Sequence, residues 1–152
     1  MLENTTPQHH RQCSHEEFER LLGMFMKEKA WQNERVTFLL LIKAGLQPDE
    51  AFRIDRVIAQ DAVNVSRLTV PGRSVPVDER LKIYLKKLIE IDDDRTYLLV
   101  PKGHSVERVM RHFLVCVEYH GFWIVPDLYD GSLTVESLHP AGAVGLPCGQ
   151  GP

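Results

Sequence analysis

The stretch VTFLLLIKAGLQPDE, residues 36–50, holds the features that decide the fold. Its first part is apolar on almost every side of a helix, which predicts a central, buried helix. Gly45 suits the left-handed conformation that ends a helix. Pro48 fits the first turn of a following helix, where Asp49 and Glu50 interact favourably with the helix dipole. The stretch predicts a buried helix, a tight turn and a second helix.

The sequence before this stretch predicts one further helix. Ser14 and Glu17 have the spacing of a capping box, and apolar residues then recur on one helical face. The central helix is expected to begin near Asn33. After the turn, the second helix is expected to run over residues 48–59. Residues 63–77, VNVSRLTVPGRSVPV, predict a β-hairpin because β-branched residues flank a Pro-Gly turn.

The sequence after the hairpin predicts two long helices and several shorter elements. Asp78 caps a helix with a clean apolar stripe, and Ser105 caps another that runs to about Tyr119. On this last helix, the residues expected to face inward are Val106, Val109, Met110, Phe113 and Val117. A short strand or extended segment is expected at residues 96–100 and a loop at residues 120–131. Thr134 is expected to cap a short final helix that Pro140 shortens.

This order of elements predicts a mainly α protein with a small antiparallel β-hairpin or sheet, an α+β fold. We expect a disordered lead at residues 1–13, a single domain at residues 14–146 and a flexible tail at residues 147–152. A chain of 152 residues fits one domain, and 43% hydrophobic with 26% charged residues fits a soluble globular protein.

Composition also limits location and partners. No run of 18 apolar residues is present, so no membrane partner is expected. Without an apolar signal core, and with only the scattered Cys13, Cys116 and Cys148, the sequence favours the reducing cytoplasm. The net charge of -3 argues mildly against a nucleic-acid partner. A local basic patch would nevertheless suffice for nucleic-acid binding.

Three stretches in order carry a resemblance to a known family. They are LLLIKAGLQPDEAFRI at residues 39–54, VPGRSVPVDERLKIYLKKL at residues 70–88 and SLTVESLHPAGAVGL at residues 132–146. Together they resemble the catalytic domain of the tyrosine recombinases, or phage integrases. The resemblance covers roughly residues 14–146 and implies the fold of that domain.

The resemblance also implies which reaction residues to look for. The family cleaves DNA with a tyrosine, while two arginines, a basic hairpin residue and histidines stabilise charge on the phosphate. Gln47 stands in place of the first arginine, Glu136 in place of a histidine and His139 in place of the second arginine. Only Arg73 matches, as the basic hairpin residue, and we expect the later histidine and the tyrosine to be missing. The chain is therefore expected not to be an enzyme and to need no cofactor.

Four basic residues are candidates for contact with double-stranded DNA: Arg73 on the hairpin, with Lys102, Arg108 and Arg111 around the helix capped by Ser105. The alternative is a solvated helix face. His120, Asp127, Asp130 and His139 could form a metal site, but we expect them to be scattered surface polar groups. Cys116 is expected to be a packing residue rather than a nucleophile. No small-molecule substrate is evident.

The leading hypothesis is a catalytically inactive, integrase-like DNA-binding protein that regulates transcription. Its source, inferred from the resemblance alone, is a mobile genetic element such as a plasmid or phage. The alternative is a non-enzymatic protein-interaction module that modulates a recombinase or another DNA-bound partner. A homodimer is possible because Phe122, Trp123, Ile124 and Val125 form an apolar run beside the region where family members exchange C-terminal segments.

Overall fold

The computed structural model describes residues 11–126 and 133–137. Within them the chain forms helices and two small antiparallel sheets, which agrees with the predicted α+β class. The helices are α1 (His15–Lys27), α2 (Gln32–Lys43), α3 (Pro48–Ala51), α4 (Arg56–Val65), α5 (Glu79–Ile89) and α6 (Val106–Tyr119). The strands are β1 (Arg11–Gln12), β2 (Arg67–Val70), β3 (Arg73–Pro76), β4 (Phe122–Pro126) and β5 (Leu133–Ser137).

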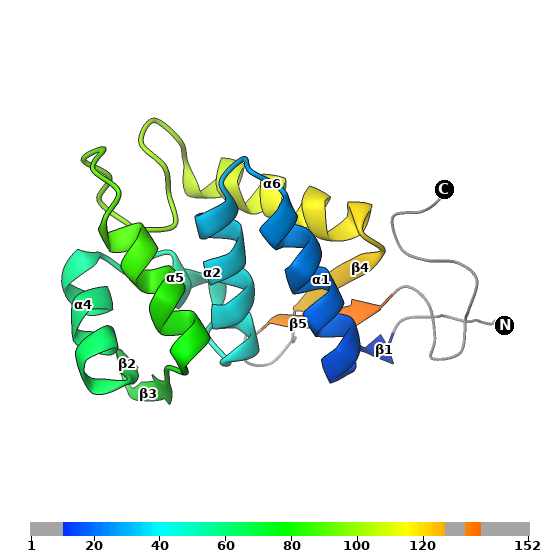
Figure 1. Ribbon diagram of the computed structural model, residues 1–152, viewed down its shortest axis with the longest axis horizontal. Helices are drawn as coiled ribbons and strands as arrows, with labels where there is room; N and C mark the ends of the chain where they lie inside the picture. The colour runs from blue at the N-terminus through cyan, green and yellow to red at the C-terminus, as the bar shows by residue number, and fades with distance from the viewer. Residues whose placement is uncertain (1–10, 127–132, 138–152) are drawn as a thin grey trace, which may run out of the picture.

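Helix α2 is the central element of the fold. It lies between α1 and α5, and α6 passes behind it (Figure 1). Every residue from Glu34 to Ile42 is buried, which confirms the prediction of a helix covered on all sides. Phe38 of α2 contacts Phe52 and Phe113, with ring centroids 4.9 and 4.5 Å away. These aromatic contacts bring the α3 region and α6 onto the same central helix.

The turn after α2 forms as predicted, but the helix that follows is shorter than expected. Gly45 has a φ of 101°, and Pro48 is the first residue of α3. The single helix predicted over residues 48–59 is wrong, because α3 ends at Ala51 and α4 begins at Arg56. The break follows from Asp55, whose Oδ1 accepts a hydrogen bond from the Ile58 N–H at 2.9 Å and starts a new helix.

The predicted β-hairpin is confirmed, with a later start. Strands β2 and β3 pair antiparallel, and the Pro71-Gly72 turn brings Val70 opposite Arg73. Residues 63–65 were expected in the first strand, but they belong to α4. Ser66 adopts the left-handed conformation, with a φ of 62°, and so ends α4 immediately before β2.

The second sheet corrects two predictions. Strands β4 and β5 are antiparallel neighbours, whereas a loop was expected at residues 120–131 and a helix from Thr134. Burial along β5 has the two-residue period of a strand, with Val135 and Ser137 buried. The rest of the predicted final helix, residues 138–146, lies outside the described residues. Strand β1, Arg11–Gln12, pairs with β5, so this part of the segment 1–13 expected to be disordered forms regular structure.

The connection between α5 and α6 also differs from prediction. Residues 96–100 form turns rather than a strand, although Leu98 and Leu99 are buried. Ser105 caps α6 as predicted, since its Oγ accepts a hydrogen bond from the Arg108 N–H at 3.1 Å. Of the five α6 residues expected inward, Val109, Phe113 and Val117 are buried and Met110 is partly buried. Val106 is 41% exposed because it lies in the first turn, beside the exposed end of this connection.

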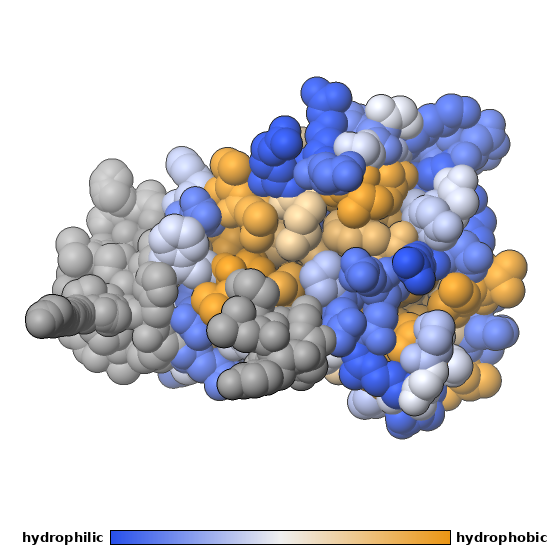
Figure 2. Space-filling model, turned by 180° about the vertical axis from the view of Figure 1, so that it is seen from behind, coloured by the Kyte–Doolittle hydropathy of each residue, from blue (hydrophilic) through white to orange (hydrophobic). Residues whose placement is uncertain are grey.

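Hydrophobic and hydrophilic residues are distributed unevenly over the surface. Seen from behind, the molecule shows a band of hydrophobic residues with hydrophilic residues above and below it (Figure 2). Helix α6 lies on this side of the molecule. Its exposed side chains include the hydrophobic residues Val115 and Tyr119, which are 60% and 70% exposed.

Candidate functional site

The hairpin and the turn after α2 meet through Arg73. Its Nη2 donates a hydrogen bond to the Gly45 carbonyl at 2.9 Å, and its Nε donates to Glu50 Oε2 at 3.2 Å. A further ion pair joins Arg73 Nη2 to Glu50 Oε1. The backbone N–H of Gln47 donates to the same Oε1 at 2.8 Å. The structure therefore brings together Arg73 and Gln47, which the sequence places 26 positions apart.

The charge of Arg73 is balanced within this contact. The side chain is 40% exposed, whereas that of Glu50 is only 16% exposed. The hydrogen bonds from Arg73 hold the pKa of Glu50 below its ordinary value, with a smaller contribution from the Gln47 N–H. Glu50 is thus ionised at neutral pH and faces the guanidinium. An anion approaching this turn would meet a carboxylate as well as a cation.

A hollow of about 250 Å³ lies beside this contact, between the α3 region and the hairpin turn. Its lining combines apolar side chains with the polar or charged residues Gln47, Asp49, Glu50, Arg53 and Thr69. Arg53 is exposed and has no ion-pair partner among the residues that the structure describes. The sequence analysis missed Arg53, since the predicted continuous helix gave no reason to turn it toward the hairpin.

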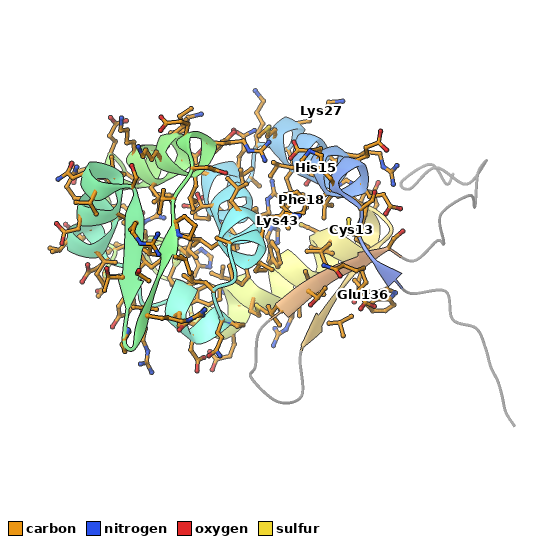
Figure 3. All side chains as sticks on the ribbon, turned by 90° about the horizontal axis from the view of Figure 1, so that it is seen from below. Cys13, His15, Phe18, Lys27, Lys43 and Glu136 are labelled. Atoms are coloured by element: carbon orange, nitrogen blue, oxygen red, sulfur yellow. The ribbon has the colours of Figure 1, made fainter. Side chains whose placement is uncertain are left out.

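A second basic surface lies on α6. Arg108 and Arg111 are both exposed, and neither has an ion-pair partner within residues 11–126 and 133–137. Lys102, on the preceding connection, is 62% exposed and lies 3.6 Å from a carboxylate oxygen of Asp94. Viewed from below, the hairpin turn and α6 both lie on the side away from α1 (Figure 3). The two elements that carry these basic residues therefore lie on the same side of the fold.

Glu136 does not join this site. It lies on β5, opposite Gln12 of β1 and Trp123 of β4. Figure 3 shows it next to Cys13, toward the opposite end of the molecule from the hairpin. His139, the other position compared with the family's reaction residues, lies outside the described residues. The structure thus groups Gln47 with Arg73 but not with Glu136.

The residues weighed as a metal site do not form one within the described chain. His120 is buried, and its Nε2 lies 3.5 Å from Glu28 Oε2. Asp127, Asp130 and His139 fall outside the described residues. Across residues 11–126 and 133–137, no group of three or more histidine, cysteine or acidic side chains is placed to hold a metal ion.

The lysines of α5 that have side-chain contacts make them with other residues of α5. Lys82 pairs with Glu79 at 3.0 Å, and the Lys87 Nζ lies 4.7 Å from the centre of the Tyr84 ring. Lys86 and Lys87 are exposed. These residues offer a comparison of equal charge for the arginines of α6.

Over the described part of the chain, no helix combines the length and the apolar character needed to cross a membrane. Comparisons with protein-family models, with curated proteins and with solved structures each find no match for this chain.

Proposed function

We propose that this chain is a non-catalytic protein that binds double-stranded DNA through the side carrying α6 and the hairpin turn. The observation that carries the proposal is a set of exposed arginines without ion-pair partners in the described residues: Arg53, Arg108 and Arg111. A guanidinium that no carboxylate neutralises is available to a phosphate, with which it forms charge-assisted hydrogen bonds. Lys102 is 62% exposed and Arg73 is 40% exposed, so both also reach solvent, although each is paired with a carboxylate.

The absence of catalysis is part of the proposal. Strand cleavage requires fixed positive charge where negative charge builds on the phosphate. At the turn, Gln47 brings no charge and Arg73 is paired with Glu50. The resemblance to tyrosine recombinases, which supplied the comparison, is itself a hypothesis. A DNA-binding role does not depend on it, because phosphate contacts need only exposed cations.

Fluorescence anisotropy with a labelled duplex tests the proposal. Binding should weaken steeply with salt, because each neutralised phosphate releases bound counterions. The double variant Arg108→Gln/Arg111→Gln should lower affinity and reduce the slope of log K against log salt by about 0.9 for each lost contact. Lys86→Gln/Lys87→Gln removes the same charge from α5 and should leave both quantities near the parent's values.

Two results would count against this function. The first is no binding to any duplex at low salt. The second is an equal loss of affinity in the α5 and α6 variants, which would show attraction by net charge instead of a defined face. Cleavage of a suicide DNA substrate would overturn the non-catalytic part alone.

We also propose that the bound DNA is regulatory and that the chain comes from a mobile genetic element, on the strength of the resemblance. A genome-wide map of DNA occupancy in the host tests this extension. Enrichment at promoters supports a transcriptional regulator. An occupancy map without peaks contradicts it while leaving DNA binding in solution intact.

A second function is a protein-interaction module, favoured by the hydrophobic band in Figure 2 and by exposed Val115 and Tyr119 on α6. Exposed hydrophobic surface of this kind typically marks an interface, including one between copies of the same chain. Light scattering after size exclusion distinguishes a dimer from a monomer. A dimer that Val115→Glu and Tyr119→Glu dissociate supports this alternative, and a parent protein that stays monomeric at high concentration contradicts self-association.

A further inference from the structure

A buried polar cluster joins α2 to α6, on parts of these helices that do not carry the proposed DNA contacts. Arg35 of α2 is 5% exposed, and its Nη1 donates a hydrogen bond to the Sγ of Cys116 at 3.4 Å. Cys116 is a half-buried free thiol on α6. The guanidinium carbon of Arg35 lies 5.6 Å from the centre of the Phe25 ring. The cation is therefore held between an aromatic face and a sulfur atom.

The guanidinium lacks acceptors for its other donors. Within the described residues, the buried Nε and Nη2 of Arg35 have no hydrogen-bond partner. Glu28 Oε1 lies 3.2 Å from Nη1, but it accepts no hydrogen bond, so this ion pair rests on distance alone. A buried charged donor without an acceptor is costly. An oxygen bonded to the sulfur would lie beside this guanidinium and add an acceptor to a site short of acceptors.

A proton acceptor also lies beside the sulfur. His112, one turn earlier on α6, places its Nε2 3.7 Å from the Sγ of Cys116. Burial lowers the pKa of His112 below its ordinary value, and the Arg35 charge lowers it further. The imidazole is therefore neutral at pH 7 and can accept a proton from the thiol. Arg35 therefore places a cation, and His112 a proton acceptor, beside the sulfur of Cys116.

We propose that Cys116 is a site of oxidation by hydroperoxides, with hydrogen peroxide as the simplest member of the class. His112 takes the thiol proton, and the thiolate sulfur attacks one peroxide oxygen. The S–O bond forms as the O–O bond breaks, and the departing hydroxide takes the proton to become water. The sulfur is oxidised to a sulfenic acid and the peroxide is reduced. The new oxygen accepts hydrogen bonds from Arg35, which stabilises the product.

Sulfenic-acid trapping tests the proposal in the intact chain. The protein is treated with hydrogen peroxide and dimedone, and mass spectrometry follows the Cys116 and Cys13 peptides. Cys13 is the matched reference, because it is also a half-buried cysteine. Cys116 should be trapped on the order of tenfold faster than Cys13 in the folded protein, because a cation and a base beside its sulfur speed the attack on peroxide. In concentrated guanidinium chloride the two rates should become equal.

Substitutions of His112 and Arg35 test the contribution of each residue to the reactivity of Cys116. His112→Gln should slow trapping at Cys116 several-fold at pH 7, with recovery at pH 9, where hydroxide deprotonates the thiol. Arg35→Gln should bring the Cys116 rate down to that of Cys13, provided that circular dichroism shows a folded protein. If Arg35→Gln does not fold, the comparison of trapping rates at Cys116 and Cys13 in the parent protein tests the proposal instead. Equal rates at Cys116 and Cys13 in the folded parent, or a Cys116 rate unaffected by His112→Gln, would overturn the proposal.

Discussion

Arg95 and Glu34 form an ion pair inside the protein. The Nη1 of Arg95, on the connection between α5 and α6, lies 2.5 Å from Oε2 of Glu34 on α2, and both side chains are buried. Arg95 also donates to the Leu98 carbonyl at 2.9 Å and to Asp93. One guanidinium therefore holds the connection that precedes α6 against the central helix.

Removal of one partner should be strongly destabilising, because it leaves an uncompensated charge in the interior. Glu34→Ala is expected to lower the free energy of unfolding by about 3 kcal/mol or more. Urea denaturation followed by circular dichroism measures the change. Glu79→Ala, which removes a carboxylate that is 87% exposed and paired with Lys82, should cost less than about 1 kcal/mol. A Glu34 variant as stable as the Glu79 variant would contradict a structural role for the buried pair.

Stability should fall in acid because three carboxylates bind arginines in the folded state. Hydrogen bonds from Arg95, Arg80 and Arg73 lower the pKa values of Asp93, Glu19 and Glu50, respectively. A lowered pKa means that the unfolded chain binds protons first, so this stabilisation is present above about pH 4 and is lost as pH falls through the folded values. Urea midpoints between pH 7 and pH 2 measure the loss.

A variant identifies the carboxylate responsible for most of that loss. Of the three carboxylates, Asp93 has the pKa that is lowered most, and its Oδ2 lies 2.7 Å from Arg95 Nη2. Asp93→Asn should be less stable than the parent at pH 7 and should lose less stability on acidification. Parallel pH profiles for the two proteins would show that the Asp93 contact does not contribute to acid sensitivity.

The features that sequence predicted well are those that a few neighbouring residues determine. The caps at Ser14, Asp78 and Ser105 are present because each side chain accepts a hydrogen bond from an N–H three residues away. Strands β4 and β5 were missed because a strand is stabilised by its partner, and the apolar run at residues 122–125 does not reveal that partner. Thr134 was interpreted as a helix cap, a role that its residue type permits equally well.

The candidate site also combines features that the sequence indicated with contacts that it did not. The resemblance compared Gln47 and Arg73 with two reaction residues of the family but predicted no contact, and in the structure both bind Glu50. The partner of Arg73 was not predicted. Glu50 is 23 positions away, and its place at the start of a helix was already explained by its interaction with the helix dipole. The contact between Arg35 and Cys116 spans 81 positions, and no periodic pattern in either helix indicates it.

Gly45 should stabilise the turn after α2 because of its backbone conformation and not because of limited space around it. Its φ of 101° is one that side-chain-bearing residues rarely adopt, while an added Cβ would meet no atom within 4 Å. Gly45→Ala should therefore destabilise the protein by about 1 kcal/mol or more through strain. Gly23, in the middle of α1, has equal space around it and is the matched control. Gly23→Ala should stabilise by about 0.5–1 kcal/mol, since alanine favours a helix interior. If both substitutions stabilise the protein, the turn accommodates alanine and the backbone argument fails.

Acidification from pH 7.5 to 5.5 should also weaken the fold, through His112. Burial, then the charge of Arg35, lowers the pKa of this imidazole, so the unfolded chain takes up a proton that the folded chain resists. Stability is therefore full above about pH 6.5 and falls as pH decreases below it, by at most about 1.4 kcal/mol for each pH unit. Urea midpoints at half-unit steps measure the slope. His112→Gln keeps a polar side chain that does not titrate and should flatten the profile in this range. A variant profile as steep as the parent's would assign the acid sensitivity to another group.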